Sequence, residues 1–199
     1  GFGDVLPRIY SIGKVPINAP FRHQSALYRF RKLDLSGRYD FFIIGGDWAV
    51  SGAVLNKPNL WYVHSPPREL FDLRKYVRNK ICVWWQRPIF FFCVFVNKIL
   101  FKKYVKHCEN IVCNSENTQK RIKMYLKKNA KVINHPIDVS KYKYKKSKGY
   151  WLSVNRLLKH KRIEMQLEAF SKLPNEKLII VGSYERGARQ FESYKRYIE

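Results

Sequence analysis

Acidic residues are scarce in this chain of 199 residues. Only 15 Asp and Glu stand against 39 Lys and Arg, so the formal net charge is +24 and the isoelectric point lies near 10.0. Such a surface favours an anionic partner over a cationic one. Nucleic acid, an anionic membrane surface and a phosphorylated small molecule all meet that requirement, and charge alone leaves the three open.

Cysteine is also sparse, and its spacing disfavours the common redox and zinc motifs. The four cysteines form no Cys-x-x-Cys pair, and the first residues show no cleavable signal pattern, which favours a reduced, cytoplasmic setting. His107, Cys108 and Cys113 are close in sequence, but their spacing matches no common zinc site. Ordinary buried thiols are therefore the favoured interpretation. The sequence has no Asp-x-Asp pair either, and we expect no metal site.

A clean membrane-spanning run is missing as well. Residues 81–101 come nearest to one. The exceptions to their apolar character are Gln86, Arg87, Pro88, Asn97 and Lys98. With the basic residues at 102, 103 and 106, this pattern suits a helix that lies in the interface of an anionic membrane and buries its aromatic side chains there. The alternative is a core helix, or a pair of helices broken at Pro88.

What the sequence does contain is a regular alternation of strands and helices, which is typical of an α/β protein with a mainly parallel sheet. Apolar runs rich in β-formers predict four strands, over 39–46, 60–65, 110–115 and 130–136. The first, "YDFFIIGG", predicts a buried strand. Ser115 is the expected N-cap of the helix that follows, whose apolar stripe consists of Ile122, Tyr125 and Leu126.

A second unit is predicted after a basic run. Residues 141–149, "KYKYKKSKG", are polar and end at a glycine, which indicates a linker. The pattern beyond it is a strand, an amphipathic helix and a strand, over 150–155, 162–173 and 177–182, with one more helix expected afterwards. We therefore expect two Rossmann-like domains with parallel sheets, both incomplete in this chain: residues 1–140 and residues 150–199.

Candidate ligand-binding residues follow the predicted strands, because ligands of open parallel sheets bind at the carboxyl ends of the strands. His64 directly follows one strand, and two prolines stiffen the loop that holds it. Its imidazole could donate a hydrogen bond, shuttle a proton or steady developing charge. A histidine that only caps the loop is the alternative.

A second candidate site lies after the linker. Arg156 follows a strand, and Lys161 lies at the start of a helix. Two cations beside a helix N-terminus suit a diphosphate, since the free N–H groups and the helix dipole add to their charge. A solvated basic loop is the alternative in a protein this basic.

Four stretches of the chain, in order, carry a pattern that a known family shares. "WYVHSPPRELFDL" (61–73) has the form His-x-Pro-x-Arg, and "NIVCNSENTQKRI" (110–122) is a strand ending in Asn-Ser before a helix. "INHPIDVSKY" (133–142) has the form Pro-x-Asp-x-x-x-aromatic. Residues 153–182, "SVNRLLKHKRIEMQLEAFSKLPNEKLIIVG", run from a strand through Arg-Leu and Lys to a helix ending in Glu-Ala-Phe and a strand ending in Val-Gly. Together they resemble the family four glycosyltransferases, retaining enzymes of the GT-B fold, and the first stretch resembles the mannosyltransferase-like members.

The resemblance implies a role for each candidate residue. Arg156 and Lys161 would grip the diphosphate of a GDP- or UDP-linked sugar donor, and His64 would lie near the transferred sugar. The remaining candidates for acceptor or sugar binding are Arg68, Gly45 and Gly46, although Arg68 could equally be a surface ion-pair partner of a nearby acidic residue. The implied reaction is metal-independent and needs no cofactor. Its acceptor would be a glycan or a lipid-linked molecule.

The chain also departs from the family pattern. Asn155 and Arg162 stand where the family has glycine. The family's Glu-x7-Glu element is expected beyond Glu199, and its glycine-rich acceptor loop before Gly1. We therefore expect an internal fragment of a longer enzyme that does not transfer sugar by itself.

Two other functions stay open from the sequence. One is a non-catalytic, membrane-associated remnant of a glycosyltransferase. The other is a basic nucleic-acid-binding protein, which the scattered lysines and the lack of a nucleic-acid-binding motif disfavour. Under the enzyme interpretation, the basic surface predicts a cytoplasmic protein peripheral to the inner face of a membrane.

Overall fold

The computed structural model describes residues 9–13 and 22–183. The chain divides into two compact units, residues 1–137 (unit 1) and 138–199 (unit 2). The helix expected after residue 182 lies outside the described residues.

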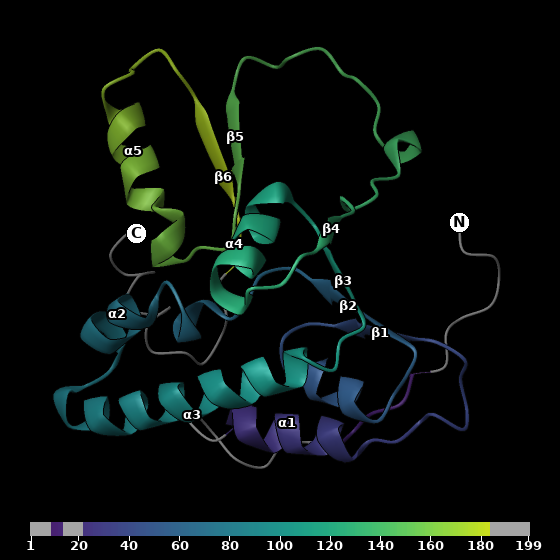
Figure 1. Cartoon of the computed structure of the whole chain (residues 1–199). Coiled ribbons are helices and arrows are strands. Elements are labelled where there is room, and N and C mark those ends of the chain that lie inside the picture. The colour runs from purple at the N-terminus through teal and green to yellow at the C-terminus, as the bar shows by residue number, and fades with distance from the viewer. Residues whose placement is uncertain (1–8, 14–21, 184–199) are drawn as a thin grey trace. The chain divides into compact units, whose positions relative to one another are not determined.

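Unit 1 contains a four-stranded parallel sheet in the order β1–β2–β3–β4 (Figure 1). Its strands are β1 (Phe42–Gly45), β2 (Asn59–Val63), β3 (Asn110–Cys113) and β4 (Lys131–Val132). All three pairings are parallel, which confirms the α/β class and the four strands predicted in this unit. The strand order follows the chain, so right-handed crossovers place successive connections on one face of the sheet.

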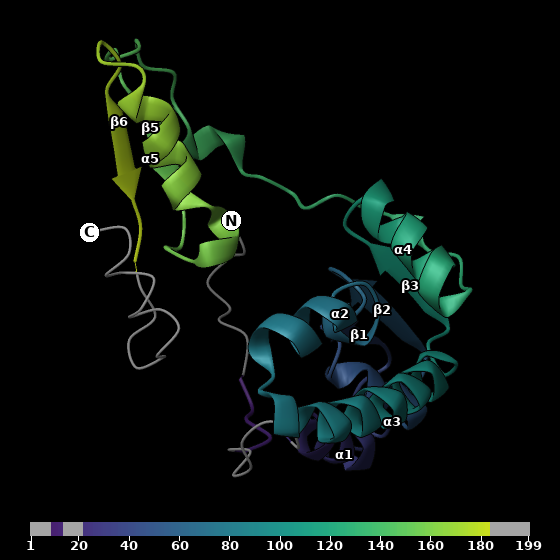
Figure 2. The same cartoon turned by 90° about the vertical axis from the view of Figure 1, so that its left-hand side faces the viewer.

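The connections of unit 1 are mainly helical. α1 (Arg22–Lys32) precedes β1, and the connections between the strands include a 3-10 helix (Ala49–Val54), the short α2 (Arg74–Tyr76), α3 (Arg87–Val105) and α4 (Glu116–Leu126). In both views α1 and α3 lie on the same side of the sheet (Figures 1 and 2).

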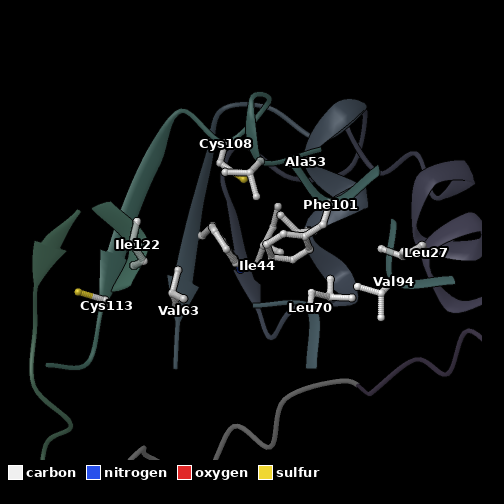
Figure 3. Packing of buried hydrophobic residues seen from close by; sticks show 13 residues of the cluster. Leu27, Ile44, Ala53, Val63, Leu70, Val94, Phe101, Cys108, Cys113 and Ile122 are labelled. Carbon is white, nitrogen blue, oxygen red and sulfur yellow. The ribbon is translucent and has the colours of Figure 1, made fainter. Parts of the chain in front are cut away.

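The hydrophobic core of unit 1 lies between the helices and one face of the sheet. Strand residues Ile44 and Val63 meet Phe101 of α3 and Ile122 of α4 in a single cluster (Figure 3). Trp61 is fully buried and packs edge-on against Phe101, with ring centroids 5.7 Å apart. In β2, alternation along the strand therefore buries every second side chain.

The prediction that β1 is a buried strand was wrong. β1 is an edge strand of the described sheet, and only Ile44 of its residues is buried. Ile43 points away from the core and is 75% exposed. A continuous apolar run cannot distinguish a strand covered on both faces from one covered on a single face.

Two buried asparagines fix the amino-terminal edge of this sheet. The side-chain amide of Asn59 lies within hydrogen-bond distance of the carbonyls of Ala53, Asn56 and His107, and its Oδ1 accepts from the backbone of Glu109. Asn56 donates to the carbonyls of Leu33 and Gly52. These buried amides thus satisfy the loop carbonyls at this edge of the sheet.

Most of the run at 81–101 lies in α3, a helix with one buried face and one exposed face. In the described part of the chain, no helix is long and apolar enough to cross a membrane. α3 begins at Arg87 with Pro88 in its first turn, where proline is tolerated, and a 3-10 turn (Trp84–Gln86) precedes it. One face of α3 is buried in the core, as the core-helix alternative predicts, while several aromatic residues on the other face are exposed.

Unit 2 has the predicted strand, helix and strand: β5 (Trp151–Val154), α5 (Ile163–Ser171) and β6 (Leu178–Val181) (Figure 2). β5 and β6 pair in parallel. Ile163, the first residue of α5, is 1% exposed.

Candidate functional site

Two histidines lie face to face at the carboxyl edge of the unit 1 sheet. His64 directly follows β2, as predicted, and its side chain is exposed. His135 lies in the segment that follows β4. The two imidazole rings are stacked, with centroids 5.2 Å apart and planes inclined by 22°. This edge of the sheet therefore presents an exposed imidazole pair.

Tyr62 and Asn114 contact the ring of His135. The Tyr62 hydroxyl donates to the carbonyl of Ile133 at 3.0 Å and lies 3.3 Å from Nδ1 of His135. The Asn114 side-chain nitrogen lies 3.5 Å from Nε2 of the same ring. Tyr62 also packs edge-on against His64, with ring centroids 5.3 Å apart. Residues from β2, β3 and the end of β4 thus position both imidazoles.

The loop that carries His64 is tied to the first turn of α4. The Thr118 hydroxyl lies 3.1 Å from the carbonyl oxygen of His64 and 2.8 Å from Oδ1 of Asn114, and its single hydrogen can serve one of these acceptors at a time. Ser115 accepts a hydrogen bond from the backbone nitrogen of Thr118 at 3.3 Å, which confirms the predicted N-cap. The helix start and the histidine loop are consequently held together.

Sequence reasoning missed His135. The strand predicted over 130–136 places this residue inside the sheet, whereas β4 ends at Val132 and releases it into a loop. The signal that could have found it is Pro136, which cannot donate to a strand ladder and disfavours pairing at this point.

The two glycines at the end of β1 lie at the same edge of the sheet as His64. Gly46 has a φ of +81°, a left-handed conformation that glycine adopts without strain. Its carbonyl accepts a hydrogen bond from the indole of Trp61 at 2.9 Å. A Cβ added at Gly45 or Gly46 would meet no atom within 4 Å, so the space beside this turn is open.

Arg68 makes the ion pair that its alternative interpretation predicts. Its guanidinium donates twice to Oδ2 of Asp72, at 3.0 and 2.8 Å, while Arg121 of α4 donates to Oδ1 at 2.9 Å. Burial acts to raise the pKa of Asp72, but the hydrogen bond from Arg68 and the charge of Arg121 outweigh it and hold that pKa below its ordinary value. Arg68 is half exposed and remains accessible to an anion.

The structure of unit 2 places both predicted phosphate-binding cations in one loop region. Arg156 lies two residues beyond β5, and Lys161 ends a 3-10 turn (Lys159–Lys161) immediately before the N-cap of α5. Both residues are exposed. The N-cap is Arg162, which has a φ of +52°. Glycine adopts this left-handed conformation without strain, which explains why the resembled glycosyltransferase family has glycine at the position of Arg162.

A close backbone contact fixes the start of this loop. The Asn155 backbone nitrogen donates to the carbonyl of Val181 at 3.0 Å, so the ladder continues past β5. A Cβ added at Gly182 would collide with the carbonyl oxygen of Asn155. Gly182, which directly follows β6, therefore lets the loop that carries Arg156 pack closely against the end of that strand.

Three of the four cysteines, Cys93, Cys108 and Cys113, have the character of ordinary buried thiols, while Cys82 is half-buried. Burial raises the pKa of Cys93 and Cys113, and it raises that of Cys108 to about 12 from an ordinary value of 9.0 despite the nearby charge of Lys128. A protonated thiol is a weak metal ligand and a weak nucleophile. Among the residues that the structure describes, no three His, Cys, Asp or Glu side chains gather in a way that could hold a metal ion.

The fold and the site together define an α/β protein with Rossmann-like parallel strand units, whose candidate residues follow the strands. No protein-family model matches the chain. Among curated proteins, it is similar to alpha-1,3/1,6-mannosyltransferase ALG2 of Candida glabrata, with 26% identity over 208 residues. The match covers 92% of this chain and 42% of that relative, so the chain spans less than half of the relative's length. This similarity confirms the resemblance to glycosyltransferases that the motifs predict.

Proposed function

We propose that this chain is part of a retaining glycosyltransferase of the GT-B fold, which moves a hexosyl group from a nucleotide-diphosphate sugar to a glycan or lipid-linked acceptor. The observation that carries the proposal is the similarity over 92% of the chain to a mannosyltransferase, which also favours mannose as the sugar. Residues 1–140 would form part of the acceptor-side domain, and residues 150–199 would begin the donor domain. No transfer is expected from the 199 residues alone.

Arg156 and Lys161 would bind the donor diphosphate. Their exposure and their position beside the N-terminus of α5 support this role, because the free backbone N–H groups there favour an anion. The charge that develops on the leaving diphosphate would be neutralised by the two side chains and the helix terminus.

His64 would contact the transferred sugar or stabilise the oxocarbenium-like transition state. Its exposure at the carboxyl edge supports the proposal, since ligands of parallel sheets bind there. The open turn at Gly45 and Gly46 would admit the acceptor, and Arg68 would meet an acceptor phosphate with the half of its side chain that stays exposed.

Direct nucleotide binding tests the donor site. GDP and UDP would be titrated into the 199-residue chain by calorimetry, with the corresponding nucleosides as reference ligands. We expect the diphosphates to bind more tightly than the nucleosides, and Arg156→Gln and Lys161→Gln each to weaken binding about tenfold, because each removes a charge-assisted contact. Lys159→Gln is the matched control, since it removes an exposed cation of the same 3-10 turn.

The outcomes separate the proposal from its rivals. Equal losses in Lys159→Gln and Lys161→Gln would show that net charge alone attracts the nucleotide, and the donor site would be wrong. Tight, salt-dependent binding of an oligonucleotide that GDP and UDP do not displace would favour a nucleic-acid-binding protein. Transfer of sugar by the 199 residues themselves would overturn the expectation that they are an incomplete enzyme.

A further inference from the structure

The exposed side of α3 and of the turn before it is strongly apolar. We call it the outer face of α3 and define it by side chains that are 43% to 75% exposed. They are Val83, Trp84, Trp85, Ile89, Phe91, Phe92, Phe95 and Ile99. Apolar patches that mix several aromatic rings are rare on proteins that bind nothing there.

The other side of the same helix is already committed to the core. Val94 and Phe101 are 5% and 3% exposed and belong to the core cluster of unit 1. The register of α3 is thereby fixed, because turning the helix to hide the outer face would expose this buried side. The outer face is consequently a stable feature of the folded unit.

Charge of a single sign surrounds the outer face. Between Asp72 and Glu109 the sequence contains no acidic residue. The basic residues of the same segment are Arg74, Lys75, Arg78, Arg87, Lys98, Lys102, Lys103 and Lys106, together with Lys80. Lys102 lies seven residues after Phe95 and thus continues the exposed stripe of the helix beyond its apolar part.

A shallow groove on this face combines both kinds of side chain. Its volume is about 350 Å³, and Phe91 and Phe95 line it together with Arg74, Lys98 and Lys102. The guanidinium carbon of Arg78 lies 5.6 Å from the ring centroid of Phe91. Basic side chains therefore lie beside aromatic rings in this groove, an arrangement that suits the phosphate headgroup and the acyl chain of a lipid.

We propose that the outer face of α3 is a docking surface for an anionic lipid bilayer. Tryptophans and phenylalanines flanked by lysines and arginines match the interfacial region of a membrane, where rings lie at headgroup depth and cations meet lipid phosphates. A protein partner would fit less well, since lysine is depleted at protein interfaces. The inference rests on α3 alone and does not depend on the proposed transferase activity.

Vesicle binding tests the docking surface. The full 199-residue chain would be sedimented with phosphatidylcholine vesicles that contain or lack phosphatidylserine, at low and high salt. We expect binding to the anionic vesicles, a blue shift of tryptophan fluorescence, and weakening by salt. Phe92→Ser with Phe95→Ser should weaken binding about tenfold or more, because both rings are largely exposed and their loss leaves the core intact.

Two control variants make the result specific. Tyr144→Ser removes a ring that is 94% exposed in unit 2, and Lys143→Gln with Lys145→Gln removes as much charge there as Lys102→Gln with Lys103→Gln removes from α3. Only the α3 variants should lose vesicle binding. Circular dichroism would show that each variant remains folded.

Three results would overturn the proposal. Binding that Phe92→Ser with Phe95→Ser leaves unchanged would indicate adsorption by net charge. Vesicle binding that weakens equally in the variants of α3 and of unit 2 would also indicate adsorption by net charge. A dimer in sedimentation that these α3 variants dissociate, without vesicle binding, would assign the face to a second copy of the chain. GDP and UDP would be titrated into the same variants. Because the proposed donor site lies in unit 2, the α3 variants should bind these nucleotides like the parent chain, so the two proposals can fail independently.

Discussion

At the level of single residues, ring contacts with His135 and Tyr62 restrain the side chain of His64. Stacked aromatic rings contribute about 0.5–1.5 kcal/mol, which is similar to thermal energy or above it and biases the side chain towards one rotamer. The Thr118 contact with the His64 carbonyl fixes the backbone of the same residue. The proposed sugar-contacting group is thus oriented by these neighbours before any ligand arrives.

His135→Ala should change the environment of His64 without unfolding the unit. His135 is exposed, so little stability is lost, but the His64 ring loses the shielding of a ring stacked at 5.2 Å. We expect the His64 ring-proton resonances to move downfield in NMR spectra. His23→Ala is the control, because His23 packs against Trp48 instead. Unchanged His64 signals in His135→Ala would mean that the rings do not stack in solution.

The buried Cys108 should make folding stability depend on alkaline pH. Its pKa is raised from 9.0 to about 12 in the folded state, so the folded chain keeps a proton that the unfolded chain releases first. The resulting stability is fully present below pH 9.0 and is lost as pH rises from 9.0 towards about 12. Urea unfolding at pH values on both sides of 9.0 should show a smaller loss for Cys108→Ala than for the parent chain.

Cys82→Ala provides the comparison for this measurement. Cys82 is only half-buried, and its replacement should leave the alkaline loss of stability as in the parent chain. If Cys108→Ala and the parent chain lose stability in parallel, the Cys108 thiol does not carry the effect.

At the level of elements, the sequence predicted the strands β1 to β6 and the helices α4 and α5, because apolar runs and helical stripes mark them, but it did not predict the 3-10 helices that carry Arg68 and Lys161. It could not predict how far pairing extends. β4 ends at Val132, and this single boundary decides whether His135 lies inside the sheet or in the loop that follows it. Nor could it separate the two faces of α3, since both are apolar and only packing distinguishes them.

Gly182→Ala should disrupt the loop that carries Arg156. The added methyl group would collide with the Asn155 carbonyl and crowd the side chain of Leu157. Overpacking of this kind costs about 1–3 kcal/mol. Hydrogen exchange should therefore accelerate at the Asn155 and Leu157 amides, whose bonds to Val181 and Ser183 extend the ladder.

The reference for this variant is Gly37→Ala. A Cβ at Gly37 meets nothing within 4 Å, and exchange in unit 2 should stay as in the parent chain. Unaltered exchange at Asn155 in Gly182→Ala would show that the backbone contact is looser in solution than in the structure.

At the level of the whole molecule, both units share the positive charge, but they differ in how much apolar surface they bury. The charge of +24 is spread over both units, whereas the core cluster of 13 buried residues belongs to unit 1. Among the described residues of unit 2, Ile163 is the one buried apolar side chain. Burying one such side chain contributes about 1.5–3 kcal/mol, and two paired strands are marginal by themselves.

The two units should therefore differ in local stability within the 199-residue chain. Amides of β2 and β3 should exchange with solvent about a hundredfold more slowly than those of β5 and β6, because exchange follows the free energy of local opening. Hydrogen exchange followed by mass spectrometry of peptides would measure both units in one experiment. Saturating GDP or UDP should slow exchange in the Arg156 loop and leave β2 unaffected, if the donor site lies where we propose. Equal protection of all four strands without nucleotide would contradict this prediction, since it would mean that the units unfold as a single cooperative body.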